Sequence, residues 1–242
     1  MERSWKINMN TVLVVDDDKE IVDAIEIYLR NEGISVIKAY DGIQALQALM
    51  EEEIHLILMD IMMPKMDGLR TTMRIREEKN IPIILISAKS EDTDKILGLN
   101  MGADDYITKP FNPLELIARV KSQLRRYMTL GNYNNLTRED ETIIKSNGLV
   151  INLESKEVFV EGEAIRVTAT EFGILELLLK NKGKVFSIDE IYEKVWKEPS
   201  YNAENTVAVH IRRIREKIEI NPKEPKYLKV VWGIGYKIEK YD

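Results

Sequence analysis

The first half of the chain alternates short apolar segments with amphipathic segments of helical spacing. In the first amphipathic segment, apolar residues such as Ile21, Ile25 and Leu29 recur three and four positions apart, as a helix with one buried face requires. Strands are predicted at Val12–Val15, Ser35–Ala39, Leu56–Met59, Pro82–Ile86 and Asp105–Ile107. Such regular alternation predicts an α/β fold with a doubly wound, five-stranded parallel sheet of the flavodoxin-like kind and right-handed crossovers.

The second half has a different pattern. The polar, Asn-rich stretch "YMTLGNYNNLTREDE" lacks apolar periodicity, which is typical of a linker. After it we expect a short β-meander, three helices and a terminal hairpin, "YLKVVWGIGYKIE", which together make an α+β domain. Capping boxes at Thr168 with Glu171 and at Ser187 with Glu190 mark two helix starts. The predicted domains are 11–127 and 141–240, joined by a linker at 128–140.

Composition excludes several classes of protein. There is no cysteine, and the two histidines, His55 and His210, lie far apart in sequence, which argues against a zinc site or a Cys/His nucleophile. No apolar run is long enough to span a bilayer, and the charged segment Met1 to Asn10 does not resemble a signal peptide, so we expect a cytoplasmic protein with no membrane partner. Residues 141–242 carry 17 acidic and 17 basic side chains, which leaves 24 and 18 in the remainder. Any nucleic-acid surface must therefore be a local patch.

Polar side chains follow four of the predicted strands at the points where the strands end. Asp16 and Asp17 follow the first strand, Asp60 the third, Ser87 the fourth and Lys109 the fifth. Ligands of open parallel sheets bind beyond these carboxyl ends. Neighbouring carboxylates repel by roughly 4 kcal/mol per pair at an effective dielectric constant near 20, and a divalent cation removes that repulsion. Oxygen-only ligands favour Mg²⁺ or Mn²⁺.

Magnesium commonly joins carboxylates to phosphate, so this edge of the sheet predicts a phosphoryl ligand. Lys109 and Ser87 are suited to phosphate oxygens, and Asp60 can act as a nucleophile that forms an acyl phosphate. The alternative for Asp16 and Asp17 is a solvated turn that leads to a helix N-cap at Asp18. Taken alone, three consecutive aspartates are more often such a turn, and the functional prediction depends on the joint placement.

Four segments resemble the receiver domain of two-component response regulators: "VLVVDDD", "LILMDIMMPKMDGL", "IPIILISAKSE" and "GADDYITKPF". The resemblance covers residues 11 to 127. It implies that Asp60 accepts a phosphoryl group from a sensor histidine kinase and that Ser87 and Lys109 bind the phosphoryl oxygens. It implies a Mg²⁺ site made by Asp60, Asp17 and the backbone carbonyl of Met62, with Asp16 bonded to a metal-bound water. It also implies a cis peptide bond at Lys109-Pro110.

The segment "ENTVAVHIRRIREKIE" predicts an amphipathic helix that can enter a DNA major groove. Its apolar stripe is Val207, Ile211, Ile214 and Ile218, and the opposite face carries Asn205, Val209, Arg212, Arg213 and Glu216. Arginine there can reach guanine or phosphate, and valine can contact a thymine methyl group. A basic amphipathic helix that merely faces solvent is the alternative.

"VTATEFGILELL", "NTVAVHIRRIREKI" and "VVWGIGYKI" resemble the winged helix-turn-helix output domain of OmpR/PhoB-class regulators. The resemblance implies that Thr206 binds phosphate and that the hairpin is a wing over the minor groove. Arginine stands in many members where this chain has Trp232, so Lys229 or Lys237 would compensate by touching phosphates. It further implies that Val209, Arg212, Arg213 and Arg215 face the groove and the DNA backbone. Within the class, the chain is similar to the vancomycin-resistance (VanR-type) regulators, which implies control of glycopeptide-antibiotic resistance genes.

The same resemblance implies how the two domains are coupled. On phosphorylation Ser87 moves toward the phosphoryl group and Tyr106 turns inward, after which the receivers form a homodimer that binds double-stranded promoter DNA and works with RNA polymerase. The expected dimer interface consists of Lys95, Asp104, Asp105, Glu115 and Arg119 around Ile96 and Ala118. Arg126 also belongs to this charged face.

Two other functions compete with a phosphorylation-switched transcription factor. One is an Asp-based phosphotransferase or phosphatase, against which Met62 stands where such enzymes use an acid for proton transfer. We therefore expect no enzyme, but a phosphoacceptor with at most weak self-dephosphorylation. The other is a constitutive DNA-binding protein whose receiver is only a dimerisation scaffold.

Overall fold

The structure, a computed structural model, describes residues 10–88, 97–131, 142–197, 199–200 and 203–240. The chain divides into two compact units, Met1–Leu124 and Arg125–Asp242, and each is described by itself. Among the described residues, no helix has the length and hydropathy that crossing a membrane requires.

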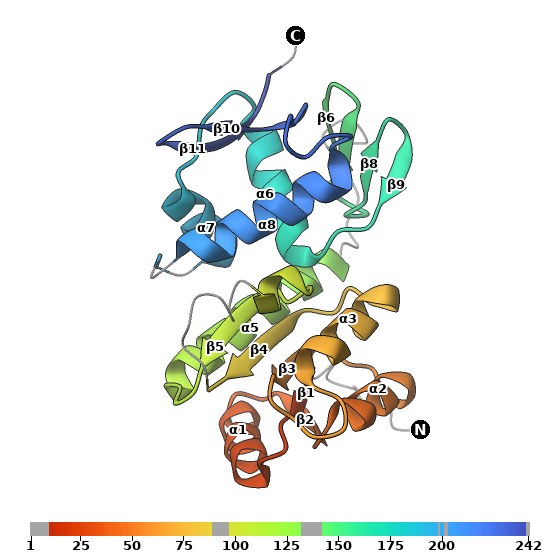
Figure 1. The fold of residues 1–242 in the computed structure, drawn as a ribbon, viewed down its shortest axis with the longest axis vertical. Helices are drawn as coiled ribbons and strands as arrows, with labels where there is room; N and C mark the ends of the chain where they lie inside the picture. Colours follow the sequence, from red (N-terminus) through yellow and green to blue (C-terminus); the bar gives the residue numbers. More distant parts are fainter. Residues whose placement is uncertain (1–9, 89–96, 132–141, 198, 201–202, 241–242) are drawn as a thin grey trace, which may run out of the picture. The chain divides into compact units, whose positions relative to one another are not determined.

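The N-terminal unit contains a five-stranded parallel sheet with the strand order β2-β1-β3-β4-β5 (Figure 1). This confirms the predicted fold class of the first half. Each strand lies within one residue of its predicted bounds at either end. The strands are β1 (Thr11–Val15), β2 (Ser35–Ala39), β3 (Leu56–Asp60), β4 (Ile83–Ser87) and β5 (Asp105–Thr108). Every residue of β3 and β4 is buried, because helices cover both faces of the sheet.

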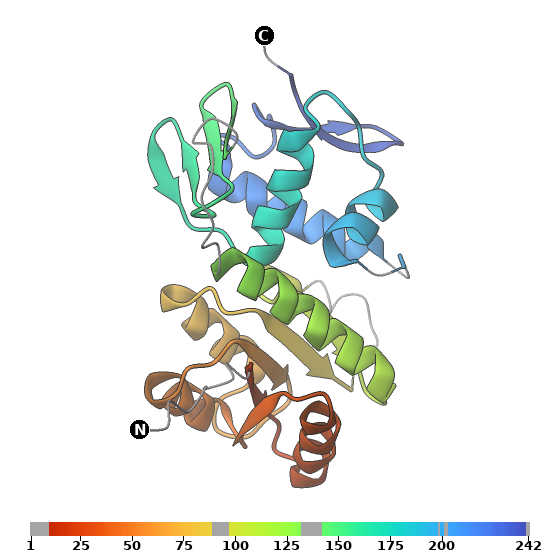
Figure 2. The ribbon, with the colours of Figure 1, turned by 180° about the vertical axis from the view of Figure 1, so that it is seen from behind.

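The helices of this unit form two layers. Val12, Val14 and other alternate strand residues pack against α1 (Lys19–Asn31) and α5 (Pro113–Gly131), which Figure 2 shows on the same side of the sheet. On the other face, α2 (Gly42–Glu51) and α3 (Gly68–Glu78) pack against each other. Residues 97–100 are also helical. This alternation brings the carboxyl ends of all five strands to one edge of the sheet.

The C-terminal unit is an α+β winged-helix domain, as predicted. An antiparallel four-stranded meander precedes three helices, and a two-stranded hairpin closes the unit. The meander is β6 (Ile143–Ser146), β7 (Leu149–Asn152), β8 (Val158–Val160) and β9 (Glu163–Ile165), the helices are α6 (Ala169–Lys180), α7 (Ile188–Trp196) and α8 (Ala203–Ile218), and the hairpin is β10 (Leu228–Val231) and β11 (Gly235–Ile238). Phe172 and Trp196 are fully buried in its core. Both predicted capping boxes are present.

The predicted linker begins too early. Helix α5 continues to Gly131, so residues 128–131 are helical. Met128 and Leu130 favour helix, and the glycine at position 131 is a residue type that commonly ends one. Residues 132–140 of the predicted linker lie outside the described residues.

Candidate functional site

Three carboxylates meet at the carboxyl edge of the parallel sheet. Asp60 is the last residue of β3, and Asp16 and Asp17 follow β1 directly. One oxygen from each lies within 4.8 Å of the others. Asp16 and Asp60 are buried while Asp17 is exposed, so the cluster opens to solvent on one side. A set of hard oxygen donors with an open side fits Mg²⁺, which keeps several of its waters.

Lys109 connects two of these carboxylates. Its Nζ lies 2.6 Å from Asp16 Oδ2 and 2.7 Å from Asp60 Oδ1. The other oxygen of Asp60, Oδ2, accepts a hydrogen bond of 2.6 Å from the backbone N–H of Met62. Lys109 follows β5, two strands away from Asp60, and the peptide bond that joins it to Pro110 is cis, as predicted. The sheet therefore places a cation and an N–H donor on opposite oxygens of one carboxylate.

Burial and charge act in opposite directions at this site. Burial raises the pKa of Asp60 and the neighbouring Asp16 carboxylate adds to the rise, while Lys109 and the Met62 N–H counter it. For Lys109, burial lowers the pKa, but bonds to Asp16 and Asp60 outweigh it, so the pKa is raised above its ordinary value. The ammonium of Lys109 thus stays charged at neutral pH and partly neutralises two buried carboxylates.

The predicted switch pair lies on neighbouring strands beside this cluster. Ser87 is the last residue of β4 and is 1% exposed, and Tyr106 on β5 is also buried. In the register of the two strands, Leu85 is opposite Tyr106 and Ser87 is opposite Thr108. The serine hydroxyl therefore comes from the strand next to that of Asp60.

A further ion pair, which was not predicted from the sequence, fixes the loop between β3 and α3 to the start of α2. Lys65 Nζ lies 2.6 Å from Oδ2 of Asp41, the buried residue that caps α2. The N–H of Gly42 donates to the carbonyl of Met66 in the same loop. A Cβ at Gly42 would come within 2.0 Å of the Thr71 hydroxyl, so the close approach needs glycine. These contacts fix the segment that carries Met62.

Replacing Asp41 by Asn should change the acid sensitivity of the receiver. Bonds from Lys65 and from the Gln44 N–H lower the pKa of Asp41 below its ordinary value of 3.8. Asparagine also caps helices, so the change can keep the cap while it removes the charge that Lys65 binds. A depressed folded-state pKa contributes stability that is present above pH 3.8 and is lost as the pH falls through the folded-state pKa. Thermal unfolding from neutral pH to about pH 3 should therefore show the two proteins converging in acid.

The matched control is Asp67→Asn, at the half-buried cap of α3, where the carboxylate pairs with the exposed Arg70. If the difference between the Asp41 variant and the parent persisted unchanged in acid, the ion pair would not be its cause.

Two residues of the predicted dimer interface, Asp104 and Asp105, are buried in the receiver itself. Asp104 is completely buried and pairs with Arg76 of α3 at 2.7 Å, so it stabilises the receiver itself. Asp105 and Glu115 both bind Arg119, at 3.1 and 2.9 Å. The predicted residues Lys95 and Ile96 lie outside the described residues. The structure therefore places both aspartates inside the receiver, and the dimer interface itself stays a prediction.

Helix α8 exposes a narrower face than its apolar periodicity predicts. Ala208, Arg212 and Glu216 are exposed, and Arg212 pairs with Glu216 at 2.9 Å. Arg213 does not face outward, because its guanidinium lies 3.1 Å from the fully buried carboxylate of Glu171. The prediction that Arg213 reads a groove is corrected.

Other predicted contacts of α8 also turn inward. Val209 is buried in this structure, so its predicted outward position is corrected. Arg215 donates to the carbonyl of Leu228 on β10 at 3.0 Å and lies over the ring of Tyr236. Burial lowers the pKa of Arg215, and the nearby Tyr236 and Glu219 offset part of this effect because each of them raises it. Of the remaining predicted residues, the half-buried Asn205 and Thr206 lie near the start of α8, and Lys229, Trp232 and Lys237 lie in the hairpin.

A hollow of about 610 Å³ separates the exposed face of α8 from the hairpin. Arg212 and Arg215 line it from the helix, Tyr236 from β11, and Lys223 from the loop that follows the helix. The helix and the hairpin thus form the two sides of one partly basic surface.

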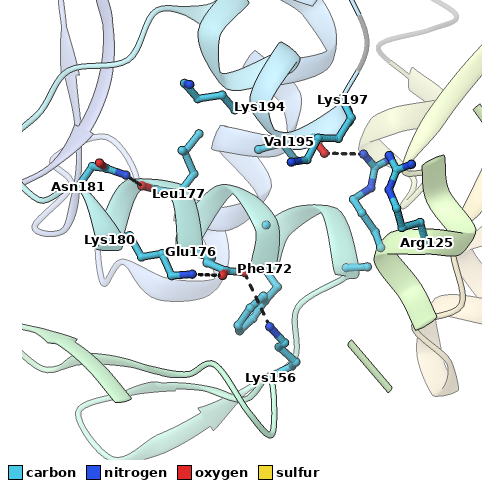
Figure 3. Close-up of a pocket in the computed structure, with 13 residues that line it drawn as sticks. Arg125, Lys156, Phe172, Glu176, Leu177, Lys180, Asn181, Lys194, Val195 and Lys197 are labelled. Carbon is cyan, nitrogen blue, oxygen red and sulfur yellow. Dashed lines mark hydrogen bonds and ion pairs between the residues drawn. The ribbon is translucent and has the colours of Figure 1, made fainter. Parts of the chain in front are cut away.

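A cluster of ion pairs lies along α6. Figure 3 shows Glu176 between Lys180, at 2.6 Å, and Lys156, at 3.9 Å. Burial lowers the pKa of Lys156, which also lies over the ring of Phe172. The cation and the aromatic ring join the turn after β7 to the helix.

Comparisons with known proteins agree with this fold and site. Residues 12–121 match the family described as "Response regulator receiver domain", and residues 162–238 match "Transcriptional regulatory protein, C terminal". The chain belongs to the response-regulator family of transcriptional regulators, with the OmpR/PhoB type of domain organisation.

Two relatives and one solved structure are similar to this chain over nearly its whole length. The chain is 45% identical to the "Regulatory protein VanR" of Enterococcus faecium over 95% of this chain and 98% of that protein. It is 44% identical to "Regulatory protein VanRc" of Enterococcus gallinarum over the same shares. Among solved structures, the response regulator DrrB of Thermotoga maritima, an OmpR/PhoB homologue, is 33% identical with a TM-score of 0.50, over 96% of this chain and all of that one.

Proposed function

We propose that this protein is a phosphorylation-switched transcriptional regulator that accepts a phosphoryl group at Asp60 from a sensor histidine kinase. The observation that supports this most is the position of Asp60. It lies at the carboxyl edge of the sheet within a cluster of three carboxylates, and its Oδ1 is 2.7 Å from Lys109 Nζ. A buried, oriented carboxylate beside a cation is suited to nucleophilic attack on phosphorus.

In the proposed transfer, a carboxylate oxygen of Asp60 attacks the phosphorus of a phosphohistidine. The O–P bond forms as the P–N bond breaks, and the imidazole nitrogen leaves with the electron pair, which gives an acyl phosphate on Asp60. The Met62 N–H orients the carboxylate through its second oxygen. Lys109 and Ser87 then bind phosphoryl oxygens. Asp17, Asp60 and the Met62 carbonyl would hold Mg²⁺, with Asp16 bonded to one of its waters, and the ion would supply positive charge to the transferring group.

Phosphorylation would act on DNA binding through assembly. We expect the receivers to dimerise through the face that includes Glu115 and Arg119, while two copies of α8 enter successive major grooves of double-stranded promoter DNA. Linking two weak sites raises their effective concentration and increases affinity without new base contacts. Asp17 is exposed at the open side of the carboxylate cluster, which supports access for the phosphoryl donor.

Footprinting on genomic fragments tests the proposal directly. With acetyl phosphate as donor, protected sites should appear at lower protein concentrations than without it. Equal footprints with and without donor, in a sample shown to be phosphorylated, would favour the constitutive DNA-binding alternative.

Within the DNA interface, Arg212 is the arginine that α8 offers to DNA. Its side chain is 68% exposed and holds only a surface pair with Glu216, which contributes about 0–1 kcal/mol. We expect Arg212→Ala to weaken binding by about 1–3 kcal/mol if the arginine reads a base, or to lower the slope of log affinity against log salt by about 1 if it contacts phosphate. Fluorescence anisotropy over a salt series distinguishes the two, and Lys182→Ala, in the turn that follows α6, is the control for lost charge.

The proposal also includes the genes that this regulator controls, its location and its further partners. We propose glycopeptide-antibiotic resistance genes as targets, supported by the similarity to VanR and testable by transcript levels after vancomycin treatment. A cytoplasmic location and RNA polymerase as a partner belong to this proposal. We expect no turnover of a separate substrate, because Met62 offers no proton-transfer group beside Asp60.

A further inference from the structure

The loop between β3 and α3 contains a residue with an unfavourable backbone conformation. Lys65 has a φ of +64°, in the left-handed region that lysine rarely adopts. The N–H of Met66 donates to the carbonyl of Pro64 at 2.7 Å, so Lys65 is the central residue of a γ-turn of the rare, strained kind. Such a conformation persists only where the surrounding structure holds it, and strained residues of this kind cluster at functional sites.

Three contacts hold this turn against the start of α2. Lys65 Nζ lies 2.6 Å from Oδ2 of Asp41, and the Gly42 N–H donates to the Met66 carbonyl at 3.3 Å. A Cβ at Gly42 would come within 2.9 Å of that carbonyl oxygen, so the two loops approach more closely than a larger residue would allow. Asp41 is itself fixed, because its Oδ1 accepts the N–H of Gln44 in the first turn of α2.

The same loop is bonded to the proposed phosphorylation site. The Met62 N–H donates to Asp60 Oδ2 at 2.6 Å. A Cβ at Gly68, where α3 starts, would lie 2.0 Å from the carbonyl oxygen of Asp60, so the end of the loop also approaches β3 closely. Met62 therefore lies between Asp60 and the Lys65–Asp41 pair along the chain, and the orientation of its peptide groups depends on both.

The Lys65–Asp41 pair joins an exposed cation to a buried anion. The side chain of Lys65 is 60% exposed and that of Asp41 only 3%. The bond from Lys65 lowers the pKa of Asp41, so the carboxylate is ionised at neutral pH. Loss of the lysine would leave a buried negative charge without this cation and the strained turn without this side-chain contact. The pair is thus more than an ordinary surface ion pair.

We propose that the Lys65–Asp41 pair positions the Met62 peptide for Mg²⁺ binding. The inference rests on the proposed function, in which the Met62 carbonyl is a metal ligand with Asp17 and Asp60. Groups bonded directly to metal ligands orient them and commonly contribute about 10–100-fold to metal affinity. The pair acts on Met62 through the intervening backbone, so we expect about three- to tenfold. Lys65 and Asp41 are positioning residues, and neither contacts the reacting atoms.

The test measures Mg²⁺ binding to the full-length chain by isothermal titration calorimetry, with no phosphoryl donor present. Lys65→Met removes the cation and keeps an unbranched side chain, and it should weaken Mg²⁺ binding by about three- to tenfold. Charge alone predicts the opposite sign, because removing a cation from this edge of the sheet would favour a bound divalent ion. Lys65→Arg keeps the cation and should restore binding to the level of the parent.

Labelling with acetyl phosphate supplies a second measurement. The Mg²⁺ concentration that gives half the maximal rate should rise in Lys65→Met by the same factor as the dissociation constant. The rate at saturating Mg²⁺ should stay within about twofold of the parent, because the Met62 N–H still orients Asp60. A fall in the saturating rate with unchanged Mg²⁺ dependence would contradict the proposed role.

A double-mutant cycle identifies the partner of Lys65. Asp41→Asn removes the charge that Lys65 binds, so it should weaken Mg²⁺ binding to a similar extent. In the Asp41→Asn background, Lys65→Met should then weaken binding little further, because the interaction is already absent. Losses that add in full would show that Lys65 acts without Asp41, and the inference would be wrong.

The matched control is Lys79→Met. Lys79 Nζ donates to the Leu49 carbonyl at 2.9 Å, so it also joins α3 to α2, but at the opposite end of both helices. This variant should bind Mg²⁺ as the parent does. Equal losses in Lys79→Met and Lys65→Met, or no loss in Lys65→Met, would overturn the inference. If the parent neither binds Mg²⁺ nor is labelled, the proposed function fails instead.

Discussion

Asp60→Asn should reduce phosphoryl incorporation from acetyl phosphate by about a thousandfold or more, because an amide oxygen is a far weaker nucleophile than a carboxylate. The change is nearly isosteric, and the Met62 N–H can still donate to the amide oxygen at the place of Asp60 Oδ2. Phosphate-affinity electrophoresis after a timed incubation measures the incorporation. DNA affinity of the variant should stay at the unphosphorylated level when donor is added.

The matched control is Asp18→Asn. Asp18 is an exposed carboxylate two residues from Asp16, where it caps α1 by accepting the N–H groups of Glu20 and Ile21. Asparagine caps a helix about as well, so this variant should be labelled normally. If Asp60→Asn were labelled at the rate of the control, the phosphoacceptor assignment would be wrong. If neither variant nor the parent were labelled, the donor chemistry would be at fault.

The site at the carboxyl edge of the sheet could be predicted because each of its residues lies at or directly after the end of a strand that the sequence identifies. β1 and β3 are recognisable in the sequence as buried parallel strands. Asp16 and Asp17 follow β1, and Asp60 ends β3, so the three carboxylates must meet at one edge of the sheet. Each strand contributes its polar residue independently, so errors of one residue in strand bounds did not disturb the site. The same holds for Lys109 after β5.

The inward turn of Arg213 was not predictable from periodicity. A helical wheel sorts residues by polarity and therefore places an arginine outside, whereas the structure pairs Arg213 with Glu171, which is 42 positions earlier in the chain. The receiver contains a similar pair, in which Arg76 binds the buried carboxylate of Asp104. In both cases a fully buried carboxylate determines where the cation lies, and burial of a charged residue is a property of the tertiary structure. Glu171 did carry one signal, its capping box.

Glu171 is a fully buried charge that pairs with two cations in the C-terminal unit. Its carboxylate lies 3.1 Å from Arg213 and 2.6 Å from Lys217, and it accepts the backbone N–H of Thr168 at 2.8 Å. One buried group thereby joins the start of α6 to the C-terminal half of α8. Burial alone would raise the pKa of Glu171, but the two cations and these bonds hold it below its ordinary value of 4.5.

Glu171→Ala should therefore destabilise the C-terminal unit by about 3–5 kcal/mol, because it leaves the buried guanidinium of Arg213 without this carboxylate and removes the capping box. Urea unfolding followed by the fluorescence of the buried Trp196 measures the change. Glu176→Ala is the control. It breaks the partly exposed pairs with Lys180 on the same helix and with Lys156, and it should cost about 1 kcal/mol or less.

The pH dependence separates this ion-pair explanation from simple loss of packing. Because the folded-state pKa of Glu171 is depressed, its charge contributes stability that is fully present above pH 4.5 and is lost as the pH falls through the folded-state pKa. The difference in unfolding free energy between the parent and Glu171→Ala should then shrink as the solution is acidified below pH 4.5, whereas a cavity left by the missing side chain costs the same at every pH. A constant difference would mean that Arg213 and Lys217 gain little from Glu171, and the guanidinium of Arg213 would again be a candidate for contact with DNA.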